Sequence, residues 1–279
     1  MGNCLVTQYK REVSNNELRR YETVEAIVKA KDGAVENDQL IVVGLIPGMV
    51  VSVEGGGYMA ESYAGLNNPS TRFTSYTATD YVYINLYVAN IDSRIYIKSK
   101  YSLIYLYVGA GSIITPVLND LEYCIKLSAL RIIKTDYQCQ LDKLTTLSDL
   151  GEVQMYSPNV IGELKDIGNL IKLSSVNFNG CSVGGDIIDF VSAQVANGRS
   201  SVTASSPISM YCGLSYLTFN GNTYSENTGS FLTWQSASKI ALYAGGEPIS
   251  SCTKVYTYGY TQQEAEAAFP GKTIIRVDA

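Results

Sequence analysis

One pattern of apolar residues recurs along the second half of the sequence at an interval close to 23 residues. Each copy has apolar side chains at its first, fourth and sixth positions, and the starts of six copies are 24, 23, 23, 41 and 23 residues apart. The apolar positions are Leu103, Leu106, Val108; Leu127, Leu130, Ile132; Leu150, Val153, Met155; Leu173, Val176, Phe178; Leu214, Leu217, Phe219; Ala237, Ile240, Leu242; and, in a degenerate seventh copy, Cys252, Val255, Thr257. Such a period predicts equivalent coils that stack, because one coil alone cannot bury its apolar face.

The pattern is similar to the leucine-rich repeat, whose consensus has Asn or Cys three positions after the last apolar residue. Cys181 and Asn222 stand at that position, where a side chain can bond the backbone inside the coil. A second apolar stretch also recurs, at residues 139–144, 161–167 and 183–190. The resemblance implies an irregular bacterial leucine-rich-repeat solenoid from residue 103 to about 258. A parallel β-helix-like arrangement or a sandwich of chance-spaced strands is the alternative.

Two short helices are expected within and after the repeats. The 41-residue interval contains a helix signal, with Asp186 as N-cap and Gly198 as C-terminal stop. Thr261 and Glu264 form a capping box ahead of an alanine-rich helix, and a last strand follows at 273–277. This end is expected to cap the final apolar edge of the solenoid.

Shorter apolar runs separated by turn residues precede the repeats. Strands are expected at 24–30, 40–46, 49–53, 82–88 and 94–98. The glycine- and asparagine-rich stretch 54–70 reads as a long loop or hinge. The sequence therefore predicts a mainly β chain in three parts, an N-terminal anchor segment at 1–22, a β-rich domain at 23–100 and the solenoid with its C-terminal cap at 101–279.

Tyrosine is unusually abundant, with 22 residues, and several tyrosines alternate with aliphatic residues. Within 81–88, Val82, Ile84, Leu86 and Val88 are expected on a buried face, and Tyr81, Tyr83 and Tyr87 on the other. The predicted row of rings is a candidate subunit interface, because exposed rings along an edge strand would otherwise promote aggregation.

The side chains that flank the last two apolar positions of each repeat are expected to point away from the core. Tyrosine and asparagine there suit recognition of a protein or glycan, since rings supply flat apolar area and polar groups supply directed hydrogen bonds. The candidate binding face comprises Tyr105, Tyr107, Tyr156, Asn177, Asn179, Tyr216, Asn220, Tyr243, Tyr256 and Tyr258. The alternative is that these are ordinary exposed-strand residues that bind nothing.

The absence of histidine argues against an enzyme, because it removes the usual general base and the commonest transition-metal ligand. The local carboxylate pairs Asp186/Asp189 and Glu264/Glu266 have helix-cap or solvated-face explanations. The net charge of -5 argues against nucleic acid as a partner. The six scattered cysteines are expected to be buried thiols, and no metal or cofactor is expected. No signal peptide or membrane-spanning segment is predicted.

The N-terminus carries a second resemblance, in the segment Asn3-Cys4-Leu5-Val6-Thr7-Gln8-Tyr9-Lys10 and the later step Ser14-Asn15-Asn16-Glu17-Leu18. It looks like the start of virion-associated proteins from tailed bacteriophages of gut Bacteroidales, including crAss-like phages. The resemblance implies an anchor that docks on a capsid or tail through Cys4, Leu5, Val6, Tyr9 and Leu18. It also implies an outward-facing domain in a homo-oligomer such as a trimer.

The first hypothesis is therefore a non-enzymatic structural protein of a phage virion, a head-fibre, decoration or tail-fibre subunit. Its N-terminal region would attach to other virion proteins, and its repeat face would adhere to a host surface protein or glycan. The second hypothesis is a bacterial leucine-rich-repeat surface adhesin or protein-binding scaffold. A small glycan-active enzyme that uses carboxylates is the third.

Overall fold

The computed structural model describes most of the chain and divides it into two compact units, residues 1–127 and 128–279. The described residues are 24–30, 38–54, 58–61, 74–88, 94–98, 102–109, 113–114, 121–133, 137–211, 217–223 and 230–278. The expected anchor segment, including Cys4, Leu5, Val6, Tyr9 and Leu18, lies outside them, as does most of the expected hinge. The chain is mainly β.

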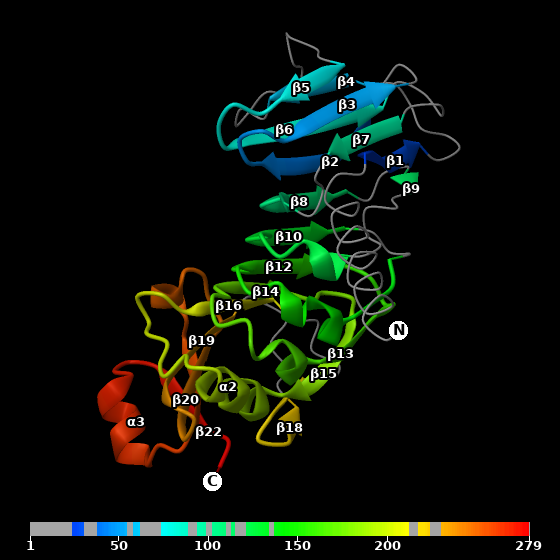
Figure 1. Ribbon diagram of the computed structural model, residues 1–279. Coiled ribbons are helices and arrows are strands. Elements are labelled where there is room, and N and C mark those ends of the chain that lie inside the picture. The colour runs from blue at the N-terminus through cyan, green and yellow to red at the C-terminus, as the bar shows by residue number, and fades with distance from the viewer. Residues whose placement is uncertain are drawn as a thin grey trace, which may run out of the picture. The chain divides into compact units, whose positions relative to one another are not determined.

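The first unit is built from antiparallel strands in two sheets, ordered β5-β3-β7-β1-β9 and β8-β2-β6-β4 (Figure 1). The strands are β1 (Val24–Ala30), β2 (Asp38–Leu45), β3 (Val50–Glu54), β4 (Tyr58–Glu61), β5 (Ser75–Thr77), β6 (Val82–Val88), β7 (Arg94–Lys98), β8 (Tyr105–Val108) and β9 (Ile113–Ile114), and a 3-10 turn, η3 (Leu121–Tyr123), follows. The expected strands at 24–30, 82–88 and 94–98 are confirmed. Those at 40–46 and 49–53 are shifted by one or two residues.

The tyrosine row on β6 is only partly exposed. Tyr81 is 69% exposed and Tyr83 47%, but Tyr87 is buried at 7%. The prediction that Tyr87 lies on an open face was wrong, because this face of β6 is buried from Asn85, which is 8% exposed, to Tyr87. Gly44 on β2 pairs with Tyr83 on one side and Tyr105 on the other. Without a side chain at Gly44, the two rings meet edge to face with centroids 5.3 Å apart.

In the second unit, short strands alternate with helical turns. The strands are β10 (Ala129–Ile132), β11 (Cys139–Gln140), β12 (Glu152–Met155), β13 (Val160–Glu163), β14 (Ser175–Asn177), β15 (Ser182–Asp186), β16 (Ile208–Tyr211), β17 (Leu217–Phe219), β18 (Asn222–Thr223), β19 (Ser230–Ser236), β20 (Lys239–Ala244), β21 (Lys254–Tyr258) and β22 (Thr273–Arg276). The helical elements are η4 (Leu141–Thr146), η5 (Leu164–Ile167), α2 (Ile187–Ala196), η6 (Ile249–Ser251) and α3 (Gln262–Ala268). Within the described residues, no helix has the length and apolar character needed to cross a lipid bilayer.

The 23-residue interval appears as parallel strand pairing in one sheet of this unit. Ala129 on β10 pairs with Glu152 on β12, and Glu152 pairs with Ser175 on β14. In Figure 1, β10, β12 and β14 lie one below another in that order. The other sheet pairs β11 with β13 and β13 with β15, also in parallel. Successive stretches therefore follow the same path, displaced by one strand spacing.

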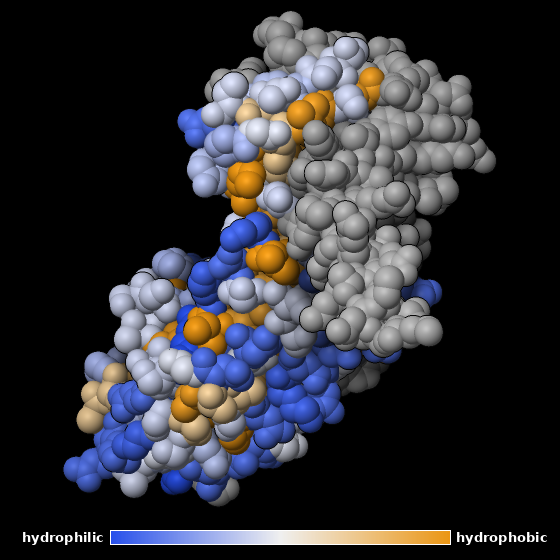
Figure 2. Space-filling view, in the orientation of Figure 1, coloured by the Kyte–Doolittle hydropathy of each residue, from blue (hydrophilic) through white to orange (hydrophobic). Residues whose placement is uncertain are grey.

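The core of this unit is formed by apolar residues that recur at equivalent positions in successive stretches. All of them have no exposed surface, and they include Leu130, Val153, Val176, Leu141, Leu164, Ile187, Leu144, Ile167 and Phe190. The side of the unit visible in Figure 2 is mostly hydrophilic, with small separate hydrophobic patches. The apolar periodicity of the sequence therefore corresponds to inward-facing positions.

After residue 178, the predicted repeats do not coincide with the strands that continue the β10-β12-β14 sheet, so that part of the prediction was wrong. Leu217 and Phe219 are buried as expected, but they lie on β17, which pairs with β15 in the second sheet. The strand that continues the first sheet is β16, where Ser209 pairs with Ser175. The pattern beginning at Leu214 resembles the true strand because both place alternate apolar residues in the core.

The expected helix in the long interval is confirmed as α2. The Asp186 carboxylate accepts the backbone N–H of Ile188 at 2.8 Å, as an N-cap residue does. Its other oxygen accepts the Thr218 hydroxyl and the Gly221 N–H, each at 2.7 Å. Asp186 therefore joins the start of α2 to the β17–β18 turn.

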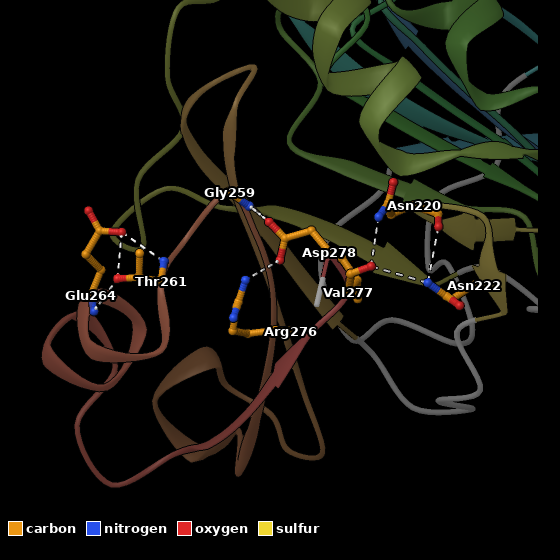
Figure 3. Close-up of polar contacts among 8 residues, drawn as sticks. All are labelled: Asn220, Asn222, Gly259, Thr261, Glu264, Arg276, Val277 and Asp278. Atoms are coloured by element: carbon orange, nitrogen blue, oxygen red, sulfur yellow. Dashed lines mark hydrogen bonds and ion pairs between the residues drawn. The ribbon is translucent and has the colours of Figure 1, made fainter.

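The C-terminal part departs from the parallel pattern. Strands β19, β20 and β21 pair antiparallel after β16, and only β22 pairs in parallel again. Figure 3 shows the contacts that hold this end: the Asn220 and Asn222 amides donate to the Val277 carbonyl, and the Gly259 N–H donates to Asp278. Helix α3 begins with the expected capping box of Thr261 and Glu264.

The charge of Glu264 gives the C-terminal end a pH dependence. The Lys239 ammonium, with the N–H and hydroxyl of Thr261, lowers the Glu264 pKa from 4.5 to about 2. Figure 3 shows the contacts between Glu264 and Thr261. A carboxyl with a depressed folded-state pKa stabilises the fold above its unfolded pKa, and that contribution is lost as the pH falls through the folded value. We expect the wild type to be more stable than Glu264→Gln above about pH 5, with the difference vanishing near pH 2. Urea unfolding at several pH values measures this, and a pH-independent difference would contradict it.

Candidate binding face on the parallel strands

Four side chains form a polar row across the first sheet of the second unit. Arg131, Gln154, Asn177 and Tyr211 lie directly opposite one another on β10, β12, β14 and β16. Directly paired residues of neighbouring strands point to the same face of a sheet. The alternate residues on these strands are buried in the core, so the polar row faces away from it.

The centre of the row is organised around the Tyr156 hydroxyl. The amides of Gln154 and Asn177 each donate a hydrogen bond to this oxygen, at 2.8 Å. A phenol that accepts two hydrogen bonds keeps its own proton for a third partner. The side-chain amide oxygen of Asn177 in turn accepts a hydrogen bond from the Asn179 backbone N–H at 3.2 Å. The arrangement presents an oriented O–H donor beside an aromatic ring.

Charged groups lie at both ends of the row. Arg131 makes a bidentate ion pair with Glu152, in which the Nε–Oε1 distance is 2.5 Å and the Nη2–Oε2 distance is 3.0 Å. At the other end, a hydrogen bond to the Glu247 carboxylate raises the Tyr211 pKa to about 12. Tyr211 therefore remains protonated at all physiological pH values and donates to Glu247. The face combines paired charges with amide and hydroxyl groups.

The structure brings together only part of the predicted binding face. Tyr156, Asn177 and Asn179 gather at the row. Tyr105 and Tyr107 lie on β8 in the first unit, where both are partly buried. Tyr216 lies outside the described residues.

The remaining predicted residues occupy other places in the second unit. Asn220 lies at the β17–β18 turn, next to the second sheet, with a positive φ of 54°. Tyr243 pairs with Val255, whereas Tyr256 pairs with Leu242, so Tyr243 and Tyr256 point to opposite faces. Tyr258 shares the face of Tyr256. The prediction that all three tyrosines share one face was therefore wrong, because β20 and β21 form an antiparallel pair instead of successive parallel coils.

Two residues of the site were missed by the sequence analysis. Tyr211 lies on a strand whose only signal is the alternation of Ile208 and Met210 with polar neighbours, and Glu247 lies in a loop far along the chain. Arg131, Glu152 and Gln154 occupy outward positions of the predicted repeats, but tyrosine and asparagine were preferred as binding residues.

The cysteine at the repeat consensus position behaves as expected. The Cys181 thiol donates to the Met155 carbonyl at 3.2 Å and is buried at 5% exposure. Burial raises the pKa of this thiol. Cys124 and Cys252 are also buried, and Cys139 is partly exposed. Asn222, by contrast, lies on an exposed hairpin and does not bond the inside of a coil.

Two of the four carboxylates singled out in the sequence cap helices. Asp186 caps α2, and Glu264 caps α3 while pairing with Lys239 at 2.8 Å. Among the described residues, no group of three or more acidic or cysteine side chains is placed to hold a metal ion.

Comparison with protein-family models, curated proteins and solved structures finds no match for this chain.

Proposed function

We propose that this chain is a non-enzymatic recognition protein, and that its second unit is a leucine-rich-repeat solenoid whose polar row binds a glycan. In-register pairing at 23-residue intervals and the inward Cys181 thiol support the repeat assignment. The observation that carries the function is the Tyr156 hydroxyl, which Gln154 and Asn177 orient through two amide hydrogen bonds.

A glycan is favoured by the chemistry of the row. Glycan hydroxyls require closely spaced donors and acceptors, and sugar rings pack on aromatic faces. Arg131 and Glu152 neutralise each other, so the row offers no uncompensated charge at that end for an ionic ligand. The bacteriophage virion is the setting that we propose, on the resemblance of the N-terminal segment. A bacterial surface adhesin is the alternative.

The test is an array of bacterial surface polysaccharides and oligosaccharides, probed with the full chain. We expect selective retention of a subset of glycans and a loss of about tenfold in affinity for Tyr156→Phe, because the change removes one donor and leaves two amides without their acceptor. Tyr258→Phe is the matched control, since Tyr258 is partly buried on the opposite face of the same sheet. No retention of any glycan, or equal binding by both variants, would overturn the proposal.

A further inference from the structure

A cavity of about 510 Å³ lies in the second unit, between the segment 201–204, strands β19 and β20, and the C-terminal end of α3. Its volume falls within the range of small-molecule sites. The residues that line it are Ser201, Val202, Thr203, Ala204, Thr233, Trp234, Gln235, Tyr243, Tyr260, Ala268 and Phe269. Every one of these side chains is uncharged.

Three aromatic side chains make one wall of the cavity rigid. The Phe269 ring packs edge to face with Tyr243 at a centroid distance of 5.6 Å, and with Tyr260 at 5.5 Å. Tyr260 and Phe269 are buried, at 5% and 9% exposure. The Lys239 ammonium lies 5.1 Å from the Tyr260 ring centroid and is neutralised by Glu264. The wall is therefore preformed and electrically neutral.

The two tyrosine hydroxyls on this wall are unpartnered. Among the described residues, neither the Tyr243 nor the Tyr260 hydroxyl has a hydrogen-bond partner. Neither oxygen is among the fully buried unpartnered atoms, so both stay accessible. Burial raises the pKa of both phenols, which keeps both O–H groups available to donate. Both hydroxyls are therefore open to a hydrogen bond with a molecule in the cavity.

We propose that this cavity binds a neutral saccharide unit. A sugar ring packs its C–H face on the aromatic wall and bonds its hydroxyls to Tyr243, Tyr260 and Gln235. A purely apolar ligand would leave the phenol groups desolvated without hydrogen bonds. A charged ligand would find no opposite charge in the lining.

The cavity and the polar row lie on the same face of the sheet. Tyr243 pairs with Phe231, Phe231 with Ser209, and Ser209 with Ser175, which is two residues from Asn177. Directly paired residues share a face, as do residues two apart on one strand. A longer glycan would extend from the cavity along the polar row, and for such a ligand the inference rests on the proposed function. Binding of a short saccharide in the cavity needs no contact with the row.

Isothermal titration calorimetry supplies the measurement. The probes are maltotriose, cellotriose, mannotriose and triacetylchitotriose, each titrated into the full chain. We expect a saturable heat of binding with at least one probe. Tyr243→Phe and Tyr260→Phe are each expected to weaken that affinity by about threefold to tenfold, because each removes one hydroxyl. Tyr258→Phe, on the opposite face, is expected to leave it unchanged.

The same titration separates this inference from the proposed function. Weaker trisaccharide binding by Tyr243→Phe and Tyr260→Phe, but not by Tyr156→Phe, supports the cavity whether or not the row binds the array glycans. The absence of any saturable heat of binding, or equal affinities for the wild type and both cavity variants, would overturn the inference. In that case row-dependent retention on the array would still support the proposed function. Unchanged urea midpoints of the variants verify that they fold.

Discussion

Replacing Phe178 with alanine is expected to lower the free energy of unfolding of the second unit by about 3–5 kcal/mol. Phe178 is among the largest fully buried side chains, at 1% exposure, and directly follows Asn177 of the polar row. Its backbone N–H donates to the Tyr211 carbonyl at 2.8 Å. The space left by the ring would therefore lie directly under the polar row.

Urea unfolding followed by Trp234 emission measures this effect, because the only tryptophan lies in the affected unit. Ile171→Ala is the control. Ile171 precedes Leu173 of the same repeat but is 39% exposed, so its loss is expected to cost about 0.5 kcal/mol or less. Similar losses for both variants would show that the stretch around Phe178 is not part of the cooperative core.

Gly259→Ala is expected to displace the C-terminal end and to lower the free energy of unfolding by on the order of 4 kcal/mol. Gly259 has a φ of +76°, and a Cβ there would lie 1.7 Å from the Ser238 carbonyl oxygen. Its N–H donates to Asp278 at 2.7 Å (Figure 3), and Tyr260 of the cavity follows it directly. Displacement of this backbone would therefore move Tyr260 and abolish the trisaccharide response.

Gly271→Ala separates backbone strain from the steric clash. Gly271 has nearly the same φ, +74°, but nothing lies within 4 Å of its Cβ position. Alanine at this position is expected to lower the free energy of unfolding by about 1–2 kcal/mol, because a residue with a Cβ is strained in the left-handed conformation. Hydrogen exchange over α3 and β22 compares the two variants. Equal exchange rates would mean that the contact with Ser238 has no effect on the position of this end.

The sequence predicts the regular elements of this chain well where local patterns decide the structure. Strict alternation predicts β6, and the turn residues before Arg94 predict β7 as a separate short strand. The 23-residue interval predicts β10, β12 and β14, because buried positions of parallel strands must recur in register. The caps at Asp186 and Thr261 were recognised because side-chain capping depends on neighbouring residues only.

The sequence did not predict the elements whose place depends on distant partners. Strand β19 lies between two expected repeats and joins the sheet by antiparallel pairing with β16. That pairing reverses the strand direction. The face on which the tyrosines of β20 and β21 lie is then determined by the β19–β20 hairpin, which has an irregularity between Trp234 and Ser236. The cavity was missed for the same reason, because its lining comes from segments separated by up to about 70 residues.

Because the offset between β10, β12 and β14 is constant, the length of the polar row depends on the number of 23-residue stretches that it crosses. Ala129, Glu152 and Ser175 are interchangeable in backbone position, so removal of one complete 23-residue stretch would rejoin the remaining strands in register. Each such step changes the reach of the row by one strand spacing, about 4.8 Å. Under the proposed function, gain or loss of whole 23-residue stretches would therefore match the polar row to longer or shorter glycans.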